Sequence, residues 1–536
     1  MRNPVSNYDA IIVGAGFSGL YQLHLLRDKL KLRCLLLEAG EGVGGTWYWN
    51  RYPGARCDSP SHSYSYYFSE NLIKKWNWTE RYPGQPEIES YLNFVADELR
   101  LRDDIKFSQT VTKCEYFQDE NYWQVKTDHG GTFSCKYLVA AVGCLSLSNR
   151  PTIKNIDKFH GSIFHTGSWP KAAVNFSGKS VGVVGTGASA IQAIPLIAEQ
   201  AKQLFVFQRT PNYSVPARNH KLTEEMSNEY KKEWQSTHEI MQTSRNGLPW
   251  LEGEISLKEI SEPVRTELLE EAWQKGGLGF REAFKGTLRD RKSNEIMSAF
   301  VKNKIAEKVD DPETVKILTD FDHPFASKRP PLDTNYFETF NRTNVSLIDL
   351  NKQPIENATT NGLETKSLTF DIDILVLATG FDAMTGAIEK LGVLGRCGTS
   401  IKDYWRNGPT TFLGVHVPNF PNFFVIAGPG SPSVLTNMPR SIEFNVEWVT
   451  DCIDYLEKNS FNFIEADPNA ADKWNKNNQK LADETLFVDA EHSWYLGANI
   501  PGKPRLFYPY AGGFPKYKEA CYDVKAMGFN GLIIGQ

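Results

Sequence analysis

Two stretches of the chain share one pattern of hydrophobic positions: an apolar run rich in β-branched residues, a glycine turn, and then apolar residues at helical spacing. The first begins at Tyr8 in YDAIIVGAGFSGLYQLHLLRDKL, and the second begins at Ser180 in SVGVVGTGASAIQAIPLIAEQA. Another short apolar run follows each, near Glu38 in LRCLLLEAG and near Arg209 in QLFVFQRT. Strand, turn, helix and strand in this order form a βαβ unit, so the pattern predicts an α/β protein with two such units.

Along the rest of the chain, the composition and the hydrophobic periodicity change twice. Between about Lys221 and Asp320 it is charged and amphipathic, as in KLTEEMSNEYKKEWQSTHEI, which predicts a helical insertion. Strand-like runs return in FNRTNVSLIDL and FDIDILVLATGFD, and the chain from about Phe412 is mixed and aromatic. We therefore expect two interleaved domains with a helical insertion. The predicted parts are the first domain at 1–150 and 386–536, the second domain at 151–220 and 326–385, and the insertion at 221–325.

The first glycine turn fits the pattern G-x-G-x-x-G through Gly14, Gly16 and Gly19. In such a turn the first glycine permits the bend, the second lets the backbone approach a pyrophosphate, and the third lets the helix pack on the strand. Glu38 stands 38 − 19 = 19 residues later, where a carboxylate can accept hydrogen bonds from both ribose hydroxyls. This context favours a dinucleotide site in a Rossmann-like domain over an ordinary glycine turn.

The second turn contains Gly185, Gly187, Ser189 and Ala190, with alanine in the third glycine position. Arg209 stands 209 − 190 = 19 residues later, where the first unit has its carboxylate. A guanidinium can bind a 2′-phosphate through two hydrogen bonds, so this site is predicted to take NADP; a solvated charge at a strand end is the alternative. Two sites imply two cofactors, with FAD at the first and NADPH at the second as the simplest assignment. The glycine that ends the strand in ATGFD, at 378–382, could lie directly against a dinucleotide.

The composition of the chain excludes several classes of partner and cofactor. The chain has 536 residues, of which 41% are hydrophobic, and its net charge of −5 comes with no basic block, so no nucleic-acid partner is expected. Eight cysteines form no Cys-x-x-Cys pair, which argues against a zinc site and a redox dithiol, and we expect no metal. No signal-peptide pattern and no uninterrupted apolar run of about eighteen residues occurs, so we expect a cytoplasmic protein without a membrane partner. The sequence carries no signal for an oligomeric state.

The stretch FHGSIFHTGSWP, between the two turns, carries the most specific signal. It contains Phe159, Gly161, His165, Trp169 and Pro170. These residues match F-x-G-x-x-x-H-x-x-x-W-P, and the chain therefore resembles the type I Baeyer–Villiger monooxygenases, in texture most of all the phenylacetone and cyclohexanone monooxygenases. Further similar segments are GGTWYWNRYPGARCD, QPEI, FQRTP, KRPPLD, GPGSPSVLTNMP and SWYLGANIPGKP. The resemblance implies NADPH- and O2-dependent oxidation of ketones to esters or lactones through a flavin C4a-peroxide, with sulfides as further substrates.

The resemblance also implies roles for single residues near the reaction. Arg329 matches the cation that stabilises the anions formed during oxygen transfer, and Asp58 matches its carboxylate partner, which also lies at the cofactor. Lys328 matches a residue that reaches the 2′-phosphate beside Arg209 and Thr210. Without the family pattern, Lys328 and Arg329 would be interpreted as a solvated loop pair and Asp58 as a turn residue.

The same resemblance implies a moving part. The stretch with His165 and Trp169 links the two domains and takes part in their movement rather than in bond-making; without the family, His165 would be interpreted as a structural residue. Trp494 falls in a match to a mobile loop, near 488–506, that closes over nicotinamide and substrate, although an aromatic residue there could equally serve packing.

Two other segments complete the expected site. Thr46 and Trp47, in the segment GGTW, are expected to contact the cofactor, and Ser433, Val434 and Leu435 are expected to shape the ketone pocket. The family pattern gives no account of the charge of Arg440, which directly follows that pocket loop.

Three other functions share part of this sequence pattern. An N- or S-oxygenating flavin monooxygenase shares the fold and cofactors, but the Trp169-Pro170 ending and the Lys328-Arg329 pair argue against it. The absence of Cys-x-x-Cys excludes a disulfide-type flavin reductase. A non-catalytic dinucleotide sensor would keep both glycine turns but would have no reason to keep Arg329 and Asp58.

Overall fold

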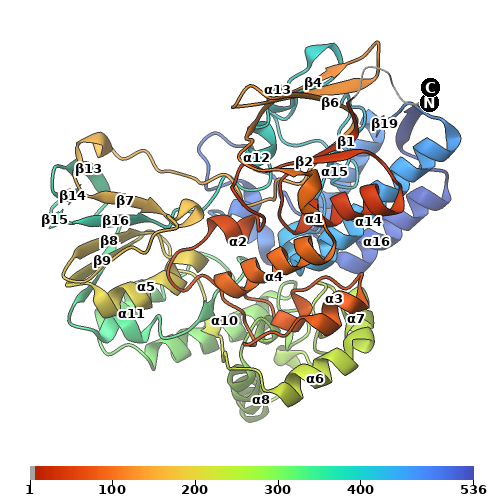
Figure 1. Ribbon diagram of the computed structural model, residues 1–536. Helices are drawn as coiled ribbons and strands as arrows, with labels where there is room; N and C mark the ends of the chain where they lie inside the picture. The colour runs from red at the N-terminus through yellow and green to blue at the C-terminus, as the bar shows by residue number, and fades with distance from the viewer. Residues whose placement is uncertain (1–6) are drawn as a thin grey trace.

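The computed structural model describes residues 7–536, and its strands gather mainly in two separate sheets (Figure 1). Within that range the larger sheet has eight strands in the order β17-β4-β5-β6-β1-β2-β3, with β18 paired to β6. β1 lies between β2 and β6 and runs parallel to both, as a βαβ unit requires. The strands are β1 (Tyr8–Val13), β2 (Cys34–Leu37), β3 (Ile105–Lys106), β4 (Val111–Phe117), β5 (Tyr122–Thr127), β6 (Thr132–Ala140), β17 (Val393–Leu394) and β18 (Phe423–Val425).

The second sheet is parallel throughout, in the order β12-β9-β8-β16-β7. Its central strands are apolar and almost wholly buried, because helices and loops cover both faces of a parallel sheet. The strands are β7 (Ser162–His165), β8 (Ser180–Val184), β9 (Gln203–Gln208), β12 (Val345–Asp349) and β16 (Ile374–Leu377). The second sheet thus takes strands from both sides of the predicted helical insertion.

Short strands make up the remaining pairs. The strands β13 (Ile355–Thr359), β14 (Gly362–Thr365) and β15 (Thr369–Asp371) form an antiparallel meander, β10 (Val215–Pro216) pairs with β11 (Leu332–Asp333), and β19 (Phe463–Ala466) pairs with β20 (Leu532–Gly535).

The helices that follow the glycine turns are α1 (Phe17–His24) and α5 (Ala188–Gln200). The long helix α14 (Met438–Asn459) packs on α1, where Gln22 Nε2 donates to Thr450 Oγ1 at 3.1 Å. The other helices around the larger sheet are α2 (Thr46–Trp49), α3 (Glu70–Lys75), α4 (Gln85–Glu98), α12 (Gly386–Glu389), α13 (Ile401–Tyr404), α15 (Pro468–Asp483) and α16 (Phe514–Ala526).

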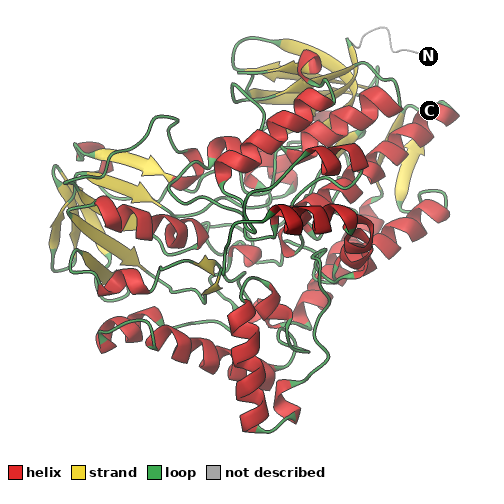
Figure 2. Cartoon of the chain, turned by 60° about the horizontal axis from the view of Figure 1, so that its bottom comes forward, coloured by secondary structure: helices red, strands yellow, loops and turns green. Residues whose placement is uncertain are grey.

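The insertion is helical, as predicted, and Figure 2 shows this helical region below the strands. Its helices are α6 (Glu224–Lys232), α7 (Trp234–Thr243), α8 (Glu262–Lys275), α9 (Gly279–Glu282), α10 (Arg291–Ala306) and α11 (Pro312–Leu318). The prediction of an α/β fold with two Rossmann-like units and a helical insertion is therefore confirmed. The exact domain boundaries stay a prediction.

Arg440 has a structural explanation. Its side chain is buried on α14, where it donates to the Glu443 carboxylate and to the Ser65 carbonyl. The guanidinium carbon lies 4.4 Å from the centroid of the Tyr67 ring. Glu443 in turn accepts from the backbone N–H of Tyr67 at 2.6 Å. The buried ion pair therefore ties α14 to the segment around residues 65–68.

Candidate active site

The first glycine turn has the geometry that its pattern predicts. Gly14 has a φ of +106°, and a Cβ there would lie 2.6 Å from the Ala141 carbonyl oxygen. A Cβ on Gly19 would lie 1.8 Å from the Gly14 carbonyl oxygen, so only glycine lets α1 pack this closely. Gly16 is the N-cap of α1 and lies against Gly45. The turn therefore presents bare backbone and a helix N-terminus, which suits a pyrophosphate.

Glu38 is buried at the end of β2 beside this turn. Its two carboxylate oxygens accept from the backbone N–H groups of Ala15 at 2.6 Å and Gly40 at 2.7 Å. Burial raises the pKa of Glu38 above its ordinary value, although these N–H donors oppose the rise. Thr46 and Trp47 follow on α2: Thr46 is exposed, and Trp47 is buried with its Nε1 donating to Tyr64 Oη at 3.3 Å.

The second turn repeats the first. Gly185 has a φ of +107°, and its Cβ would lie 2.4 Å from the Ala378 carbonyl oxygen, just as Gly14 faces Ala141. A Cβ on Gly187, the N-cap of α5, would meet nothing within 4 Å. A Cβ on Gly380, in ATGFD, would likewise meet nothing within 4 Å. The open face at the start of α5 fits a second dinucleotide.

At the start of α5, Ser189 is partly exposed and Ala190 is buried. Ser189 Oγ lies 3.0 Å from Thr166 Oγ1, which belongs to the stretch with His165. The second turn is thus connected to the linking stretch by a side-chain contact.

The structure brings the predicted 2′-phosphate residues together. Burial, together with the like charge of nearby Arg209, holds the pKa of the Lys328 ammonium below its ordinary value, although Asp322, 3.5 Å away, opposes the shift. Thr210, next to Arg209, accepts from Thr186 Oγ1 at 3.2 Å through its carbonyl oxygen. Sequence reasoning missed Asp322, because no motif marks it.

Arg329 and Asp58 form the ion pair that the resemblance implied. Arg329 Nε donates to Asp58 Oδ2 at 2.5 Å, and Nη2 donates to Oδ1 at 3.0 Å. The side chains keep only 18% and 32% of their surface exposed. Burial alone would lower the pKa of Arg329, but the adjacent Asp58 raises it above its ordinary value. Arg329 therefore stays a cation in a largely dry site.

The predicted pocket loop lies directly against this pair. Arg329 Nη1 donates to the Val434 carbonyl at 3.2 Å. Ser433 has the unusual φ of +43°, and its Oγ donates to the Ala427 carbonyl at 3.2 Å. Ser433, Val434 and Leu435 are all buried, and Leu435 lines a cavity. The loop is thus positioned by the same guanidinium that Asp58 holds.

His165 lies at the end of β7, where several segments meet. Its Nδ1 accepts from the Gly167 N–H at 2.9 Å, so the proton belongs on Nε2, which lies 3.2 Å from the Asn149 carbonyl oxygen and 3.3 Å from Thr379 Oγ1. Burial holds the pKa of His165 below its ordinary value. Trp169 is buried, and its backbone N–H donates to the Trp49 carbonyl of α2 at 3.3 Å. The stretch therefore joins β7 of the second sheet to α2, which follows the first βαβ unit.

The loop at 488–506 is anchored on ATGFD. Lys503 Nζ lies 2.6 Å from Asp382 Oδ1, and Asn499 Nδ2 donates to the Phe381 carbonyl at 2.7 Å. Trp494 is partly buried and packs edge-on against Tyr495 at 4.5 Å. Tyr495, which sequence reasoning missed, is wholly buried: burial raises its pKa, while the charge of Arg329 lowers it. Its position beside Trp494 in the family segment was the only available signal.

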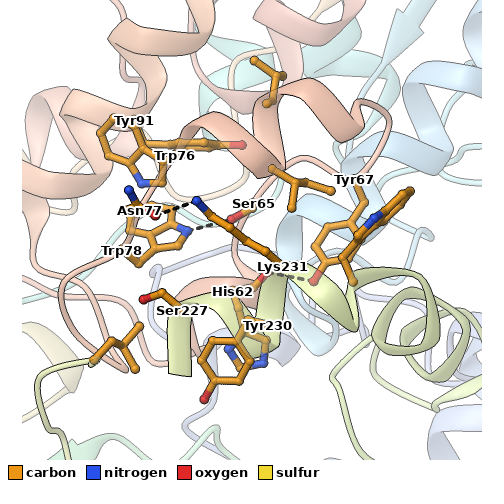
Figure 3. Close-up of a pocket in the computed structure, with 14 residues that line it drawn as sticks. His62, Ser65, Tyr67, Trp76, Asn77, Trp78, Tyr91, Ser227, Tyr230 and Lys231 are labelled. Carbon is orange, nitrogen blue, oxygen red and sulfur yellow. Dashed lines mark hydrogen bonds between the residues drawn. The ribbon is translucent and has the colours of Figure 1, made fainter. Parts of the chain in front are cut away.

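A separate cavity lies away from these residues, between α3 and the insertion (Figure 3). Tyr67, Trp76, Trp78, Tyr91 and Tyr230 contribute to its wall. Lys231 crosses it and donates to Asn77 Oδ1 at 2.6 Å (Figure 3). None of the predicted site residues lines it.

Two kinds of feature are missing from residues 7–536. No group of three or more His, Cys, Asp or Glu side chains there is arranged to hold a metal ion. No helix in that range combines the length and the apolar composition needed to cross a membrane.

Comparisons with known proteins agree with this geometry. A family model described as pyridine nucleotide-disulphide oxidoreductase matches residues 11–247, although all eight cysteines here are unpaired. A solved structure described as OTEMO in complex with FAD and NADP has a TM-score of 0.95 and 36% identity, covering 99% of this chain and 100% of that one.

Two named relatives match in sequence. A phenazine N-monooxygenase of Lysobacter antibioticus is 37% identical over 537 residues, 99% of this chain and 98% of the relative. A protein of Pseudooceanicola batsensis named Baeyer-Villiger monooxygenase is 40% identical over 533 residues, 98% of this chain and 96% of the relative. The chain belongs to the Baeyer–Villiger monooxygenases.

Proposed function

We propose that the protein is an NADPH- and O2-dependent flavin monooxygenase that converts ketones to esters or lactones. The overall reaction takes ketone, O2, NADPH and a proton to ester, NADP⁺ and water, so that one oxygen atom enters the C–C bond beside the carbonyl and the other leaves as water. The partly buried Arg329–Asp58 pair beside the pocket loop is the observation that carries this proposal.

FAD fits the first glycine turn and NADP the second. The bare backbone at Gly16 and the buried carboxylate of Glu38 suit FAD, and the open face at Gly187 with Arg209 and Lys328 suits NADP. The solved structure described with FAD and NADP supports both assignments. When bound, the flavin would carry the electrons of NADPH to O2 and supply one oxygen atom to the ketone.

The role we propose for Arg329 follows from its charge. Oxygen transfer to a ketone creates negative charge on the oxygen donor and then on the former carbonyl oxygen. A fixed cation that needs no reorganisation stabilises both, and Asp58 fixes the guanidinium plane through two hydrogen bonds. We propose that Tyr495 limits the freedom of Arg329 from the other side.

We also propose roles for the moving parts. His165 ends β7 of the second sheet and Trp169 contacts α2, which follows the first βαβ unit, and this suits a linker that transmits movement between an FAD domain and an NADP domain. The loop at 488–506 rests on ATGFD through Lys503, and its release would open the region beside Arg329. A cytoplasmic location suits the eight unpaired cysteines and the supply of NADPH.

Product analysis with the purified holoenzyme tests the function. We expect a yellow protein whose NADPH oxidation accelerates when a cyclic ketone is added, with one lactone formed per NADPH. Because one relative is named as an N-monooxygenase, the same assay includes phenazine. Formation of an N-oxide with no lactone from any ketone would replace the proposal with N-oxygenation.

A further inference from the structure

The cavity beside the pocket loop has an apolar wall and a charged wall. Pro432 and Leu435 from the loop and Phe487 make up part of the apolar wall. The part of the lining that comes from the insertion carries Arg245, Arg281 and Arg289, together with the carboxylates of Glu252 and Glu282. Three arginines beside hydrocarbon surface are more than a pocket for a neutral ketone requires.

The cavity adjoins the Arg329 pair. Leu435 directly follows Val434, whose carbonyl accepts from Arg329. The buried Tyr495 lies close enough to both Arg329 and Arg281 for each charge to lower its pKa, while burial, the larger effect, raises it. A molecule in the cavity would therefore have one side toward the Arg329 pair and the other toward the insertion.

One of the three arginines is neutralised within the chain. Arg281 is buried and pairs with Glu282. The same carboxylate accepts from Asn246 Nδ2 and, at 2.7 Å, from Trp250 Nε1. Glu282 therefore has little capacity left for a further cation.

The other two arginines have no such partner. Among residues 7–536, no carboxylate lies within 4.0 Å of the Arg245 or Arg289 guanidinium. Arg245 Nη2 donates to the Ala511 carbonyl at 2.8 Å, and burial, with the like charge of Arg289, holds the pKa of Arg245 below its ordinary value. The remaining acid of the wall, Glu252, is exposed and accepts from the Gly286 N–H. Glu252 and Glu282 act on Arg245 only from a distance and offset part of this effect. A ligand carboxylate could accept hydrogen bonds from both unpaired guanidinium groups directly.

We propose that the substrates are keto acids, in which a carboxylate pairs with Arg245 and Arg289, the hydrocarbon portion lies along Leu435 and Phe487, and the ketone carbonyl points toward Arg329. This inference rests on the proposed function and adds the substrate class. Arg245 is the principal anchor because it is the more buried of the two cations.

The test compares 4-oxocyclohexanecarboxylate with its methyl ester, which has nearly the same shape and no charge. With the holoenzyme we expect kcat/KM for the acid to exceed that for the ester by about tenfold or more, as one or two charge-assisted hydrogen bonds predict. Arg245→Gln should lower this acid-to-ester ratio about tenfold, and Arg289→Gln should lower it less. Arg406→Gln, which removes an exposed arginine just after the C-terminus of α13, is the matched control and should leave the ratio unchanged.

The outcomes separate the two proposals. Turnover of the ester with an equal or lower kcat/KM for the acid, or an unchanged ratio in Arg245→Gln, would overturn the keto-acid proposal and leave the monooxygenase function intact. If neither compound were oxygenated, calorimetric binding to the holoenzyme still decides: the acid should bind more tightly than the ester, and Arg245→Gln should remove the difference. Equal binding of the two would refute the anchor.

Discussion

Arg329 and Asp58 stand 271 positions apart in the sequence and are joined by two hydrogen bonds. Arg329→Ala should keep FAD bound, because both glycine turns are untouched, and should still oxidise NADPH. Ester formation should fall by about 10²–10³, the effect of losing one preorganised donor, and hydrogen peroxide should replace the ester. The measurement follows NADPH, ester and peroxide in one reaction.

Two further variants sharpen that experiment. Arg329→Lys should recover little activity, because an ammonium lacks the planar fork that meets Asp58. Asp58→Ala should also lower ester formation, because the Arg329 guanidinium is then no longer held in place. An Arg329→Ala enzyme that made ester at more than about a tenth of the wild-type rate, against the 10²–10³ expected, would remove Arg329 from the reaction.

Cofactor preference should depend on Arg209. Arg209→Ala removes a charge-assisted contact worth about 1.5–3 kcal/mol and should raise the KM for NADPH about tenfold or more. The KM for NADH should change little, because NADH lacks the 2′-phosphate. Steady-state kinetics with both cofactors measure the difference, and equal losses for both would contradict the assignment.

His165 should matter for turnover and not for flavin content. His165→Ala loses the contacts to Gly167 and Asn149, so the linking stretch should transmit movement poorly and kcat should fall while the flavin absorbance per protein stays constant. His160→Ala, an exposed change in the same stretch, is the control. A His165→Ala protein that lost FAD but regained full turnover when FAD was added would show a cofactor-binding role instead.

Acid should destabilise the fold through His416. Burial lowers the pKa of His416 to about 3, and Trp448 Nε1 donates to its Nε2 at 3.0 Å, so the folded protein keeps this ring neutral. Below about pH 6.5 the unfolded chain binds a proton there that the folded chain does not, and stability is lost as pH falls toward 3, by at most about 1.4 kcal/mol per unit.

The comparison with His416→Gln isolates this effect, because buried carboxylates with raised pKa values, such as Glu443, act in the opposite direction. The melting temperature of the wild type relative to the variant should fall between pH 7 and pH 5. A constant difference over that range would refute the assignment.

The Arg440–Glu443 pair should contribute to the stability of the fold and not to catalytic activity. Arg440→Ala leaves the Glu443 carboxylate buried without its cation and should cost about 3–5 kcal/mol of unfolding free energy. The double variant Arg440→Met/Glu443→Leu should cost much less, because it removes both charges. Urea unfolding of the three proteins tests this, and equal losses in the single and double variants would count against the pair.

The sequence predicted what local patterns determine. Periodicity located both βαβ units, and glycine spacing located Gly14 and Gly185, whose positive φ values the structure shows. The approach of Asp58 to Arg329 came from family resemblance, since no local pattern links residues so far apart. Arg245 was missed for the same reason, because its surroundings arise only when the insertion folds against distant loops. Asp322 lies only six residues from Lys328 and was missed because no motif marks it.

The order of the strands has a consequence for synthesis on the ribosome. The second sheet is complete once β16 has emerged, whereas the larger sheet, which begins at β1, still awaits β17 and β18, and α1 still awaits its partner α14. The part of the chain made first therefore finishes folding last. Until then the edge of β6 at Leu138–Ala140 that β18 later joins has no strand partner, and an unpaired strand edge of this kind is prone to aggregation.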